Sequence, residues 1–507
     1  MKKIAPDHAK RSRPSTTISR RDFFEMGGLV LMATAIPAPP ASDSLPAQQT
    51  ATPQPVSSIM NVLSAYMSEA ANRPLPDEVT ERAKHHILDT FAAMISGSHL
   101  VPGQHAIQFA RMYGGKEIST VAASNILCGP IEAALTNGVL AHADETDDSH
   151  SPSQSHPGCA VVPAALAIGE RFGISGTHFL RAVALGYDIG PRVTMTLGGQ
   201  QFEAHSHWST HSISPLFGAA AAAGCAANLS AQQMRWLLGY TAQQSSGLGA
   251  WNRDTEHIQK AFLFGGMTAR SGVTSALLVH SGWTGVEDIF SGKDNFFEAY
   301  NPHADPSGLS EKLGERYEVT RTNIKKWSVG SPIQAALDAL ELLRRERTLD
   351  SDQVQHVIVR LATDEAAIVN NREIPDICIQ HILAVALLDK TVTFASAHDR
   401  ARIKDPAILR ERAKIRLLPD DELERLMPLR VAVLEVILAD GTHLVRRVDN
   451  VRGTPENPMT RDEIVVKARD LIAPILGTPQ STSLISKVLA LDSATDIREL
   501  RPLLQLS

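Results

Sequence analysis

The chain has 507 residues, of which 43% are hydrophobic and 21% are charged, and its formal net charge at pH 7 is -6. This composition is that of an ordinary globular protein, so it excludes the disordered and fibrous classes. The length exceeds what one compact core accommodates, and we expect two or three domains. The net charge is negative, and the only dense cluster of positive charge lies at the N-terminus. We therefore expect no nucleic-acid partner.

Residues 1–50 are predicted to be an export signal. Basic side chains precede Arg20 and Arg21, an apolar run follows over residues 26–36, and a Pro/Ala/Ser-rich stretch comes next. This order is typical of a twin-arginine signal. The apolar run is shorter than the roughly 20 residues that cross a bilayer, so we expect a periplasmic or exported protein without stable membrane insertion. The alternative is a basic tail on a cytoplasmic protein.

Helical patterns dominate the next part of the chain, residues 56–321. A helix is predicted over residues 76–97, where apolar side chains recur every four residues and form one stripe: Val79, Ala83, Ile87, Phe91 and Ile95. Alanine-rich helices are expected over residues 161–169 and 217–228, where small side chains permit close packing of helices.

A sheet is predicted in the following part, residues 322–457. Val357, Val359 and Leu361 alternate with other residues in a run rich in β-branched side chains. Residues 430–438 and 443–448 flank Asp440-Gly441, a pair that favours a tight hairpin turn. Helical patterns return over residues 458–507. The predicted fold is therefore mainly α, with a large helical domain and a smaller α/β lid inserted into it.

Common cofactor and nucleophile motifs are absent from the sequence. There is no GxGxxG after a strand, no GxxxxGK loop and no GxSxG elbow. The four cysteines stand singly, without the spacing of a zinc or iron-sulfur site. We expect packed thiols, with a catalytic thiolate at Cys159 as the alternative because it follows His156-Pro157-Gly158.

The densest polar cluster lies over residues 142–156. Four carboxylates and three histidines occur there, directly before an apolar helix. Interleaved histidine and acid indicate general acid/base chemistry, whereas a solvated acidic loop rarely runs straight into a buried helix. A divalent metal site is the sharper alternative, and its ligands would be Asp147, Asp148, His150 and His156. No matched distal ligand pair supports that alternative, so we expect no metal and no organic cofactor.

Two further polar segments follow. His205, His207 and His211 precede an alanine-rich helix, and the N–H groups at a helix N-terminus favour an anion. Lys260 stands before Phe264-Gly265-Gly266, a position that suggests binding of a carboxylate.

In this order the segments resemble the MmgE/PrpD family, which includes 2-methylcitrate dehydratases, cis-aconitate decarboxylases and an iminodisuccinate epimerase. The resemblance covers roughly residues 58–477. It rests on five motifs: Ile87-Leu88-Asp89-Thr90-Phe91; Asn137-Gly138 with Ala141-His142; Asp147-Asp148-Ser149 with His156-Pro157; Phe217-Gly218 with four alanines; and Leu387-Leu388-Asp389. The resemblance implies a large helical domain joined to an α/β lid, a homodimer, and an active site between the domains.

Family roles carried over by position give the predicted site. The catalytic residues would be Glu145, Ser149, His156, His211, Lys260 and His381, and the substrate-binding residues would be Asp147, Asp148, His207 and Lys325. His211 is the best match to the second family histidine, and His207 is the next. Two departures occur near the lid: Gly330 replaces a histidine or cysteine five residues after Lys325, and His381 replaces a tyrosine.

The sequence therefore predicts a cofactor-independent lyase of the dehydratase type, acting on a small di- or tricarboxylic acid. His156 and His211 would form the acid/base pair, with Glu145 orienting an imidazole and Lys260 and Lys325 holding carboxylates. Epimerisation or isomerisation of a similar acid is the alternative among enzymes. An exported polyacid-binding protein without catalysis is the alternative outside enzymes, and Gly330 and His381 favour it.

Overall fold

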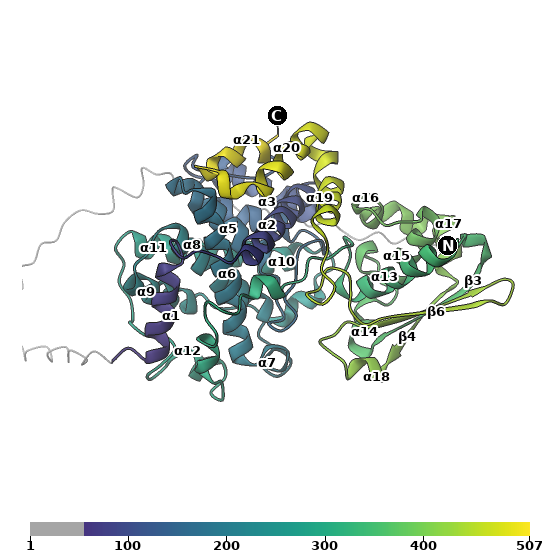
Figure 1. The fold of residues 1–507 in the computed structure, drawn as a ribbon, viewed down its shortest axis with the longest axis horizontal. Coiled ribbons are helices and arrows are strands. Elements are labelled where there is room, and N and C mark those ends of the chain that lie inside the picture. Colours follow the sequence, from purple (N-terminus) through teal and green to yellow (C-terminus); the bar gives the residue numbers. More distant parts are fainter. Residues whose placement is uncertain (1–54, 507) are drawn as a thin grey trace, which may run out of the picture. The chain divides into compact units, whose positions relative to one another are not determined.

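The computed structural model describes residues 55–506 (Figure 1). The predicted export signal over residues 1–50 lies outside the described residues. Within residues 55–506, the buried apolar side chains form two large clusters. The first core is built from residues before Trp327 and after Val451, and the second core is built from the residues between them.

Helices build the first core. They are α1 (Ser58–Glu69), α2 (Asp77–Gly97), α3 (Val101–Tyr113), α4 (Pro130–Ala141), α5 (Gly158–Phe172), α6 (Gly176–Leu197), α7 (Gly199–Ser206), α8 (Thr210–Ala226), α9 (Ala231–Gln243), α10 (Ile258–Ala261), the π-turn η2 (Phe262–Gly266), α11 (Met267–His280), α12 (Phe296–Tyr300), α19 (Arg461–Leu476), α20 (Thr478–Leu489) and α21 (Arg501–Leu504). A short pair of strands, β1 (Ser119–Thr120) and β2 (Leu127–Cys128), and the single turns η1 (Gly249–Arg253), η3 (Pro306–Leu309), η4 (Glu318–Arg321), η8 (Leu491–Ser493) and η9 (Ile497–Leu500) complete this part.

Helix α2 lies at the centre of the first core. Its predicted apolar stripe is buried, which confirms the helix, but His85, His86 and Asp89 on its other faces are buried as well. The reason is that α19, from the end of the chain, packs along α2 together with α4 and α20 (Figure 1). The C-terminal helices therefore supply one wall of a core that the N-terminal helices begin.

The alanine-rich helices are confirmed as α5 and α8, and α8 packs closely on both α5 and α6. A Cβ atom built on Gly218 of α8 would lie 2.8 Å from the carbonyl oxygen of Gly186 in α6. Helix α8 begins at Thr210, seven residues before the predicted start, and Pro215 lies inside it. His211 is consequently fixed in the first turn of a buried helix.

The second core combines a sheet with helices. Its strands are β3 (Val354–Ala362), β4 (Ile415–Asp420), β5 (Ala432–Leu438) and β6 (His443–Val448), in the order β4-β3-β5-β6, with β3 and β4 parallel and the other pairs antiparallel. Its helices are α13 (Ser331–Glu346), α14 (Thr363–Val369), α15 (Ile379–Asp389), α16 (Phe394–His398), α17 (Pro406–Arg412) and α18 (Asp421–Glu424), with single turns η5 (Ser351–Gln353), η6 (Pro375–Ile377) and η7 (Arg400–Lys404).

The sheet is buried on one face. Val357, Val359 and Leu361 point inward, and alternate residues of β5 join them in the second core. Helix α13 contacts β5 and β6, and α15 contacts β4 (Figure 1). The predicted hairpin is confirmed, since Gly441 adopts a positive φ of 84° between β5 and β6. The predicted fold class, mainly α with a smaller α/β part, is also confirmed.

One helical run, Ile258–His280, is long and apolar enough to cross a membrane by length and composition alone. Of its apolar 18-residue window, 67% is buried inside the protein. Core helices of folded proteins commonly have this character.

Candidate active site

The segment over residues 142–157, which we call the site loop, joins α4 to α5. Buried hydrogen bonds of Asp148 hold it in place. Asp148 Oδ2 accepts a hydrogen bond from Tyr187 Oη at 2.5 Å and lies 2.7 Å from His86 Nδ1, and Asp148 Oδ1 accepts from the Gly158 N–H at 3.0 Å. All three partners are buried. Asp148 thus anchors the loop to α2, α5 and α6.

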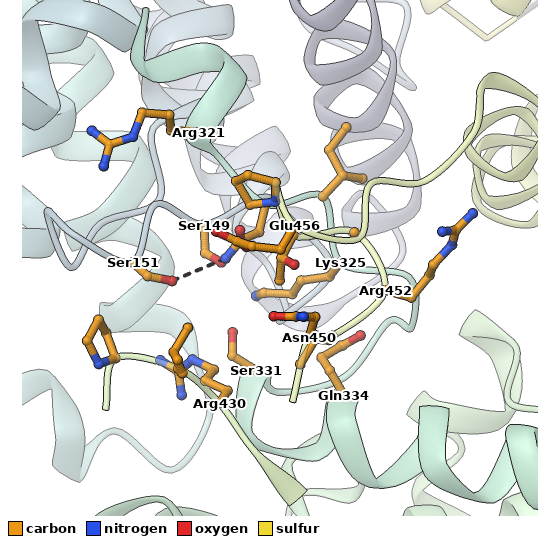
Figure 2. A pocket seen from close by; sticks show the side chains of 18 of the residues that line it. Ser149, Ser151, Arg321, Lys325, Ser331, Gln334, Arg430, Asn450, Arg452 and Glu456 are labelled. Atoms are coloured by element: carbon orange, nitrogen blue, oxygen red, sulfur yellow. Dashed lines mark hydrogen bonds between the residues drawn. The ribbon is translucent and has the colours of Figure 1, made fainter. Parts of the chain in front are cut away.

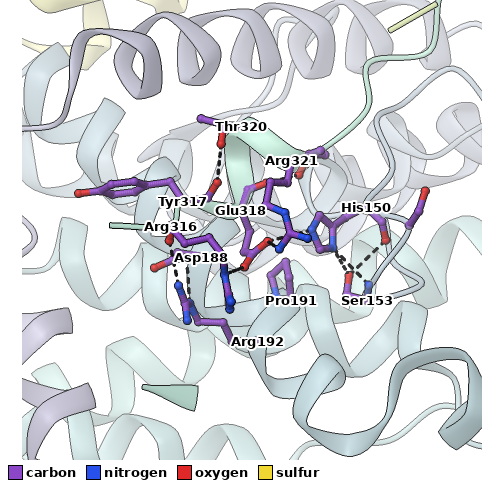
Figure 3. Close-up of polar contacts among 12 residues, drawn as sticks. His150, Ser153, Asp188, Pro191, Arg192, Arg316, Tyr317, Glu318, Thr320 and Arg321 are labelled. Atoms are coloured by element: carbon purple, nitrogen blue, oxygen red, sulfur yellow. Dashed lines mark hydrogen bonds and ion pairs between the residues drawn. The ribbon is translucent and has the colours of Figure 1, made fainter. Parts of the chain in front are cut away.

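A second anchor lies in the middle of the loop (Figure 3). His150 Nε2 is 3.2 Å from a carboxylate oxygen of Glu318, and the same carboxylate accepts bonds from Arg316 at 2.7 Å and Arg321 at 2.9 Å. Burial opposes ionisation, yet His150 and the two arginines lower the pKa of Glu318 to about 2. The loop is therefore fixed by a buried anion as well as by backbone bonds between Ser149 and Asn323.

Asp147 lies between two imidazoles. Its Oδ2 is 2.8 Å from His142 Nδ1, and its Oδ1 is 3.1 Å from His156 Nδ1. An ionised carboxylate only accepts, so the Nδ1 atoms of both rings carry a proton and donate it to Asp147. The orienting role that we predicted for Glu145 is thus performed by Asp147, because Asp147 is the carboxylate within bonding distance of the rings.

Glu145 instead pairs with two lysines. Its carboxylate bonds to Lys260 Nζ and lies 3.7 Å from Lys325 Nζ, which also donates to the Glu145 carbonyl oxygen at 2.8 Å. Lys325 Nζ is 3.7 Å from Asp147 Oδ1 as well. Although burial opposes it, these lysines hold the pKa of Glu145 well below its usual range. Two ammonium groups and two carboxylates therefore meet beside His156.

Aromatic rings form the wall of this cluster. Phe264 stacks on His211 at 4.4 Å and on His142 at 4.5 Å between ring centroids. The His156 and His211 rings are 5.4 Å apart, and Trp251 meets His211 edge-on. The predicted acid/base pair is thus brought together.

The two imidazoles are tuned to be neutral. Burial lowers the pKa of His156, against the opposing charge of Asp147. Burial, His156 and Lys260 hold the pKa of His211 well below its usual value. A neutral imidazole at neutral pH accepts a proton readily and donates one poorly.

Burial and the charge of Asp147 raise the pKa of the Cys159 thiol well above its usual value, which argues against a catalytic thiolate at Cys159.

A cavity of about 210 Å³ adjoins the cluster (Figure 2). Ser149 and Lys325 line it from the side of the site loop, and Ser331, Arg430 and Asn450 line it from the side of the second core. Lys325 therefore lies between the cavity and the histidine cluster.

Two family models match the chain. One is described as the MmgE/PrpD N-terminal domain and matches residues 61–308, and the other is described as the MmgE/PrpD C-terminal domain and matches residues 327–492. The chain belongs to the MmgE/PrpD family.

Curated relatives of this MmgE/PrpD chain are similar over most of their length. A cis-aconitate decarboxylase-like protein of Aspergillus oryzae is 25% identical over 485 residues, covering 89% of this chain and 98% of the relative. The cis-aconitate decarboxylase of Homo sapiens is 27% identical over 452 residues, covering 85% and 91%. That of Aspergillus terreus is 24% identical over 486 residues, covering 90% and 98%. Family and relatives together identify an enzyme of the lyase type.

Some predicted site residues of this MmgE/PrpD protein lie elsewhere. Asp148 anchors the loop through His86, Tyr187 and Gly158, and its predicted role in binding substrate stays a prediction. His207 is exposed at the end of α7. His381 is buried in α15, and the charged groups that act on it are Arg402, Arg412 and Asp399 rather than the cluster. Tertiary packing decides these positions, and no local pattern reports it.

The four predicted metal ligands, Asp147, Asp148, His150 and His156, are not brought together as one set. Over residues 55–506, the acidic and histidine groups close enough to share an ion are His142 with Glu145 and His257, and His142 with Asp147 and Cys159. Asp148 and His150 point to other partners, and Lys260 already occupies the Glu145 carboxylate. An ammonium group in that place repels a divalent cation.

Four contributors were not among the predicted residues: His142, His257, Phe264 and Trp251. His257 Nδ1 lies 4.0 Å from Glu145, and burial and Lys260 lower its pKa to about 3. His142 is wholly buried, and its Nε2 has no hydrogen-bond partner among the described residues. The signal for His142 was present in the motif Ala141-His142, and His257 and Phe264 flank Lys260, whereas Trp251 stands in unremarkable sequence.

Proposed function

We propose that the protein is a lyase that acts on a small di- or tricarboxylic acid and removes water by proton abstraction next to a carboxylate. The observation that carries this proposal is the orientation of His156. Its Nδ1 faces Asp147 at 3.1 Å, which leaves the Nε2 lone pair free for a proton. Its lowered pKa keeps this base unprotonated at neutral pH.

The charges around His156 suit a polyanionic substrate. Lys260 and Lys325 are the cations nearest to the imidazoles, and both are largely buried beside Glu145. A substrate carboxylate that approaches Lys325 from the cavity would gain an interaction made stronger by the low dielectric. The same ammonium groups would spread the negative charge of an enolate as it forms.

In the proposed reaction, His156 Nε2 takes the proton from the carbon next to a carboxylate. The C–O bond at the neighbouring carbon then breaks, a carbon–carbon double bond forms, and the hydroxide receives a proton and leaves as water. His211 is a weak donor because its pKa is far below neutral, so we assign the donated proton to Lys260 or to the Ser149 hydroxyl, which borders the cavity.

Decarboxylation is the second candidate, and the names of the relatives favour it. In that reaction a C–C bond breaks, carbon dioxide leaves, and a proton is added to the carbanion. An acid rather than a base would then be required, and two neutral imidazoles are less suited to that task. The lyase class and the polyacid substrate are common to both candidates.

Product analysis separates the candidates. The purified full chain is incubated with citrate-like hydroxy acids and with cis-aconitate in heavy water, and proton NMR follows each acid while released carbon dioxide is measured. We expect a hydroxy acid to yield an unsaturated acid without carbon dioxide. If cis-aconitate alone reacts and releases carbon dioxide, the reaction is decarboxylation rather than dehydration. Deuterium exchange without a new double bond would indicate epimerisation. Tight binding of a polyacid with neither turnover nor exchange would overturn the lyase proposal.

A further inference from the structure

His398 lies at the end of a short helix that contacts both cores. It ends the short helix α16, whose Phe394 packs against the first core while Ala397 belongs to the second. The Phe394 N–H donates to Asp470 of α19 at 2.8 Å. Helix α16 thus lies where the two cores meet.

The surroundings of the His398 ring define its protonation state. Nδ1 lies 2.8 Å from the carbonyl oxygen of Phe394, and a carbonyl only accepts, so Nδ1 carries a proton. Nε2 lies 2.8 Å from Asp144 Oδ2 and 3.8 Å from Asp376 Oδ2. The Asp144 contact is an ion pair rather than an in-line hydrogen bond. Because an oxygen acceptor lies beside each ring nitrogen, the doubly protonated imidazolium is the favoured form of His398.

The charged groups that face His398 are Asp144 from the site loop and Asp376 from η6, while Asp470 meets the opposite end of α16. Burial alone would favour the neutral ring, but the two carboxylates raise the pKa of His398 to about 9. His398 therefore differs from the neutral histidines of the site, although it is also largely buried.

Asp144 transmits this contact to the reacting groups. Its carboxylate accepts bonds from the N–H and the hydroxyl of Thr146, so the turn over residues 144–146 is organised around it. Glu145, inside that turn, pairs with Lys260 and Lys325. Movement of Asp144 would displace Glu145 and both ammonium groups.

We propose that His398 is a positioning residue: as an imidazolium between Asp144 and Asp376, it fixes the Glu145 turn against the second core and so holds the two lysines in register with His156. Its effect on catalysis rests on the function proposed above, whereas its charge and its hold on the loop do not. The tests therefore include measurements that need no substrate.

The first test measures the charge. The full chain is labelled with ¹³C at histidine Cε1, and His398→Gln identifies the resonance. We expect His398 to titrate near pH 9. The control variant is His443→Gln. His443 also pairs with a carboxylate, Glu435 at 2.9 Å, but its side chain is 58% exposed and it lies on β6, far along the chain from the site loop. Titration of His398 at or below the ordinary histidine value of about 6.5 would overturn the proposal.

The second test measures the hold on the loop by amide hydrogen exchange. The Thr146 amide, which bonds to Asp144, is the reporter. In His398→Gln we expect exchange over residues 143–149 to accelerate by about tenfold or more, because the buried Asp144 loses its counter-charge. The His443→Gln control should leave it unchanged. Equal protection in both variants would contradict the proposal. If His398→Gln fails to fold, Asp144→Asn provides the same test, since it should bring the His398 titration down toward its ordinary value.

The third test uses activity. Wild-type kcat/KM should fall as the pH rises through about 9, where the imidazolium is lost. His398→Gln should be about tenfold or more slower at neutral pH and should lack this alkaline limb. A variant that is slower at every pH but keeps the limb would show a merely structural role and would overturn the positioning claim. Absence of wild-type turnover with any polyacid would instead refute the proposed function and leave the first two tests decisive.

Discussion

Asp147 controls the protonation of two imidazoles at once. Because it accepts from Nδ1 of both His142 and His156, its loss would allow the proton of either ring to move to Nε2, where the base needs a lone pair. A carboxamide can accept at its oxygen but donates at its nitrogen, so it cannot replace both contacts.

We predict that Asp147→Asn lowers kcat/KM by about 10² to 10⁴, by analogy with the general cost of a wrongly oriented or wrongly protonated base. Steady-state kinetics measure the effect, and the melting temperature reports whether the fold survives. Asp462→Asn, at an exposed site in the first turn of α19, is the matched control. A rate within about threefold of wild type would remove Asp147 from the mechanism.

His381 differs from Asp147, because it is a buried residue that lies outside the site cluster. Both ring nitrogens lack hydrogen-bond partners in the part of the chain that the structure describes, and burial lowers the pKa to about 4. As the pH falls below about 6.5 the unfolded chain takes up this proton first, so folding stability is lost on the acid side.

We predict that His381→Phe raises the free energy of unfolding by about 1 to 2 kcal/mol at neutral pH, since it removes two buried polar atoms without partners. The difference in the free energy of unfolding should be larger at about pH 5, because the buried wild-type ring binds a proton less readily than the same ring in the unfolded chain. Urea unfolding at both pH values measures this, and activity should not change. Loss of activity together with a changed pH–rate profile would instead return His381 to the site, as its position in the sequence first suggested.

At the scale of elements, close approach of helix backbones explains why the site helices do not tolerate larger residues. In Gly218→Ala the new methyl group would meet the Gly186 carbonyl oxygen at 2.8 Å and Val161 at 2.9 Å. Both neighbours belong to buried helices that cannot move apart without disturbing α8, which carries His211.

We predict a loss of about 1 to 3 kcal/mol in the free energy of unfolding for Gly218→Ala, the usual cost of overpacking. Gly239→Ala in α9 is the control, because its new methyl group would meet Val286 at 3.3 Å and alanine favours a helix. Chemical denaturation of both variants provides the comparison. Equal stability of the two would show that the α6–α8 contact yields more easily than the geometry implies.

The elements that could be predicted from sequence are those whose signals are local. Alternation at Val357 and Val359 and turn chemistry at Gly441 are properties of a few adjacent residues, and they gave β3 and the β5–β6 hairpin. The start of α8 was missed because the alanine-rich pattern begins at Phe217, whereas the helix extends back through Pro215 to Thr210. Burial of α2 on every side depends on α19, nearly four hundred residues later, and no local pattern reports it.

At the scale of the whole molecule, the site is assembled from segments that are distant in sequence. His156 comes from the site loop and His211 from the first turn of α8. Lys260 comes from α10, and Lys325 comes from the loop before α13. Family resemblance identified these residues because it preserves motif order. His257 lies close to Lys260 in sequence but was given no role, and His398 stands alone in sequence; folding places both near the Glu145 turn.

The two cores also divide the chemistry between them. The first core supplies the proposed base and its orienting carboxylate, and the second core supplies Ser331, Arg430 and Asn450 to the cavity. Substrate choice is therefore expected to depend on the second core, and proton transfer on the first.

In the proposed reaction His156, oriented by Asp147, removes a proton from the carbon next to a carboxylate. The most direct measurement is the rate at which that carbon exchanges hydrogen with solvent, followed by proton NMR in heavy water for the wild-type chain and for His156→Gln. We predict exchange or elimination in the wild type and a decrease of about 10³ in the variant, with the fold retained. Equal rates in both proteins would contradict the claim.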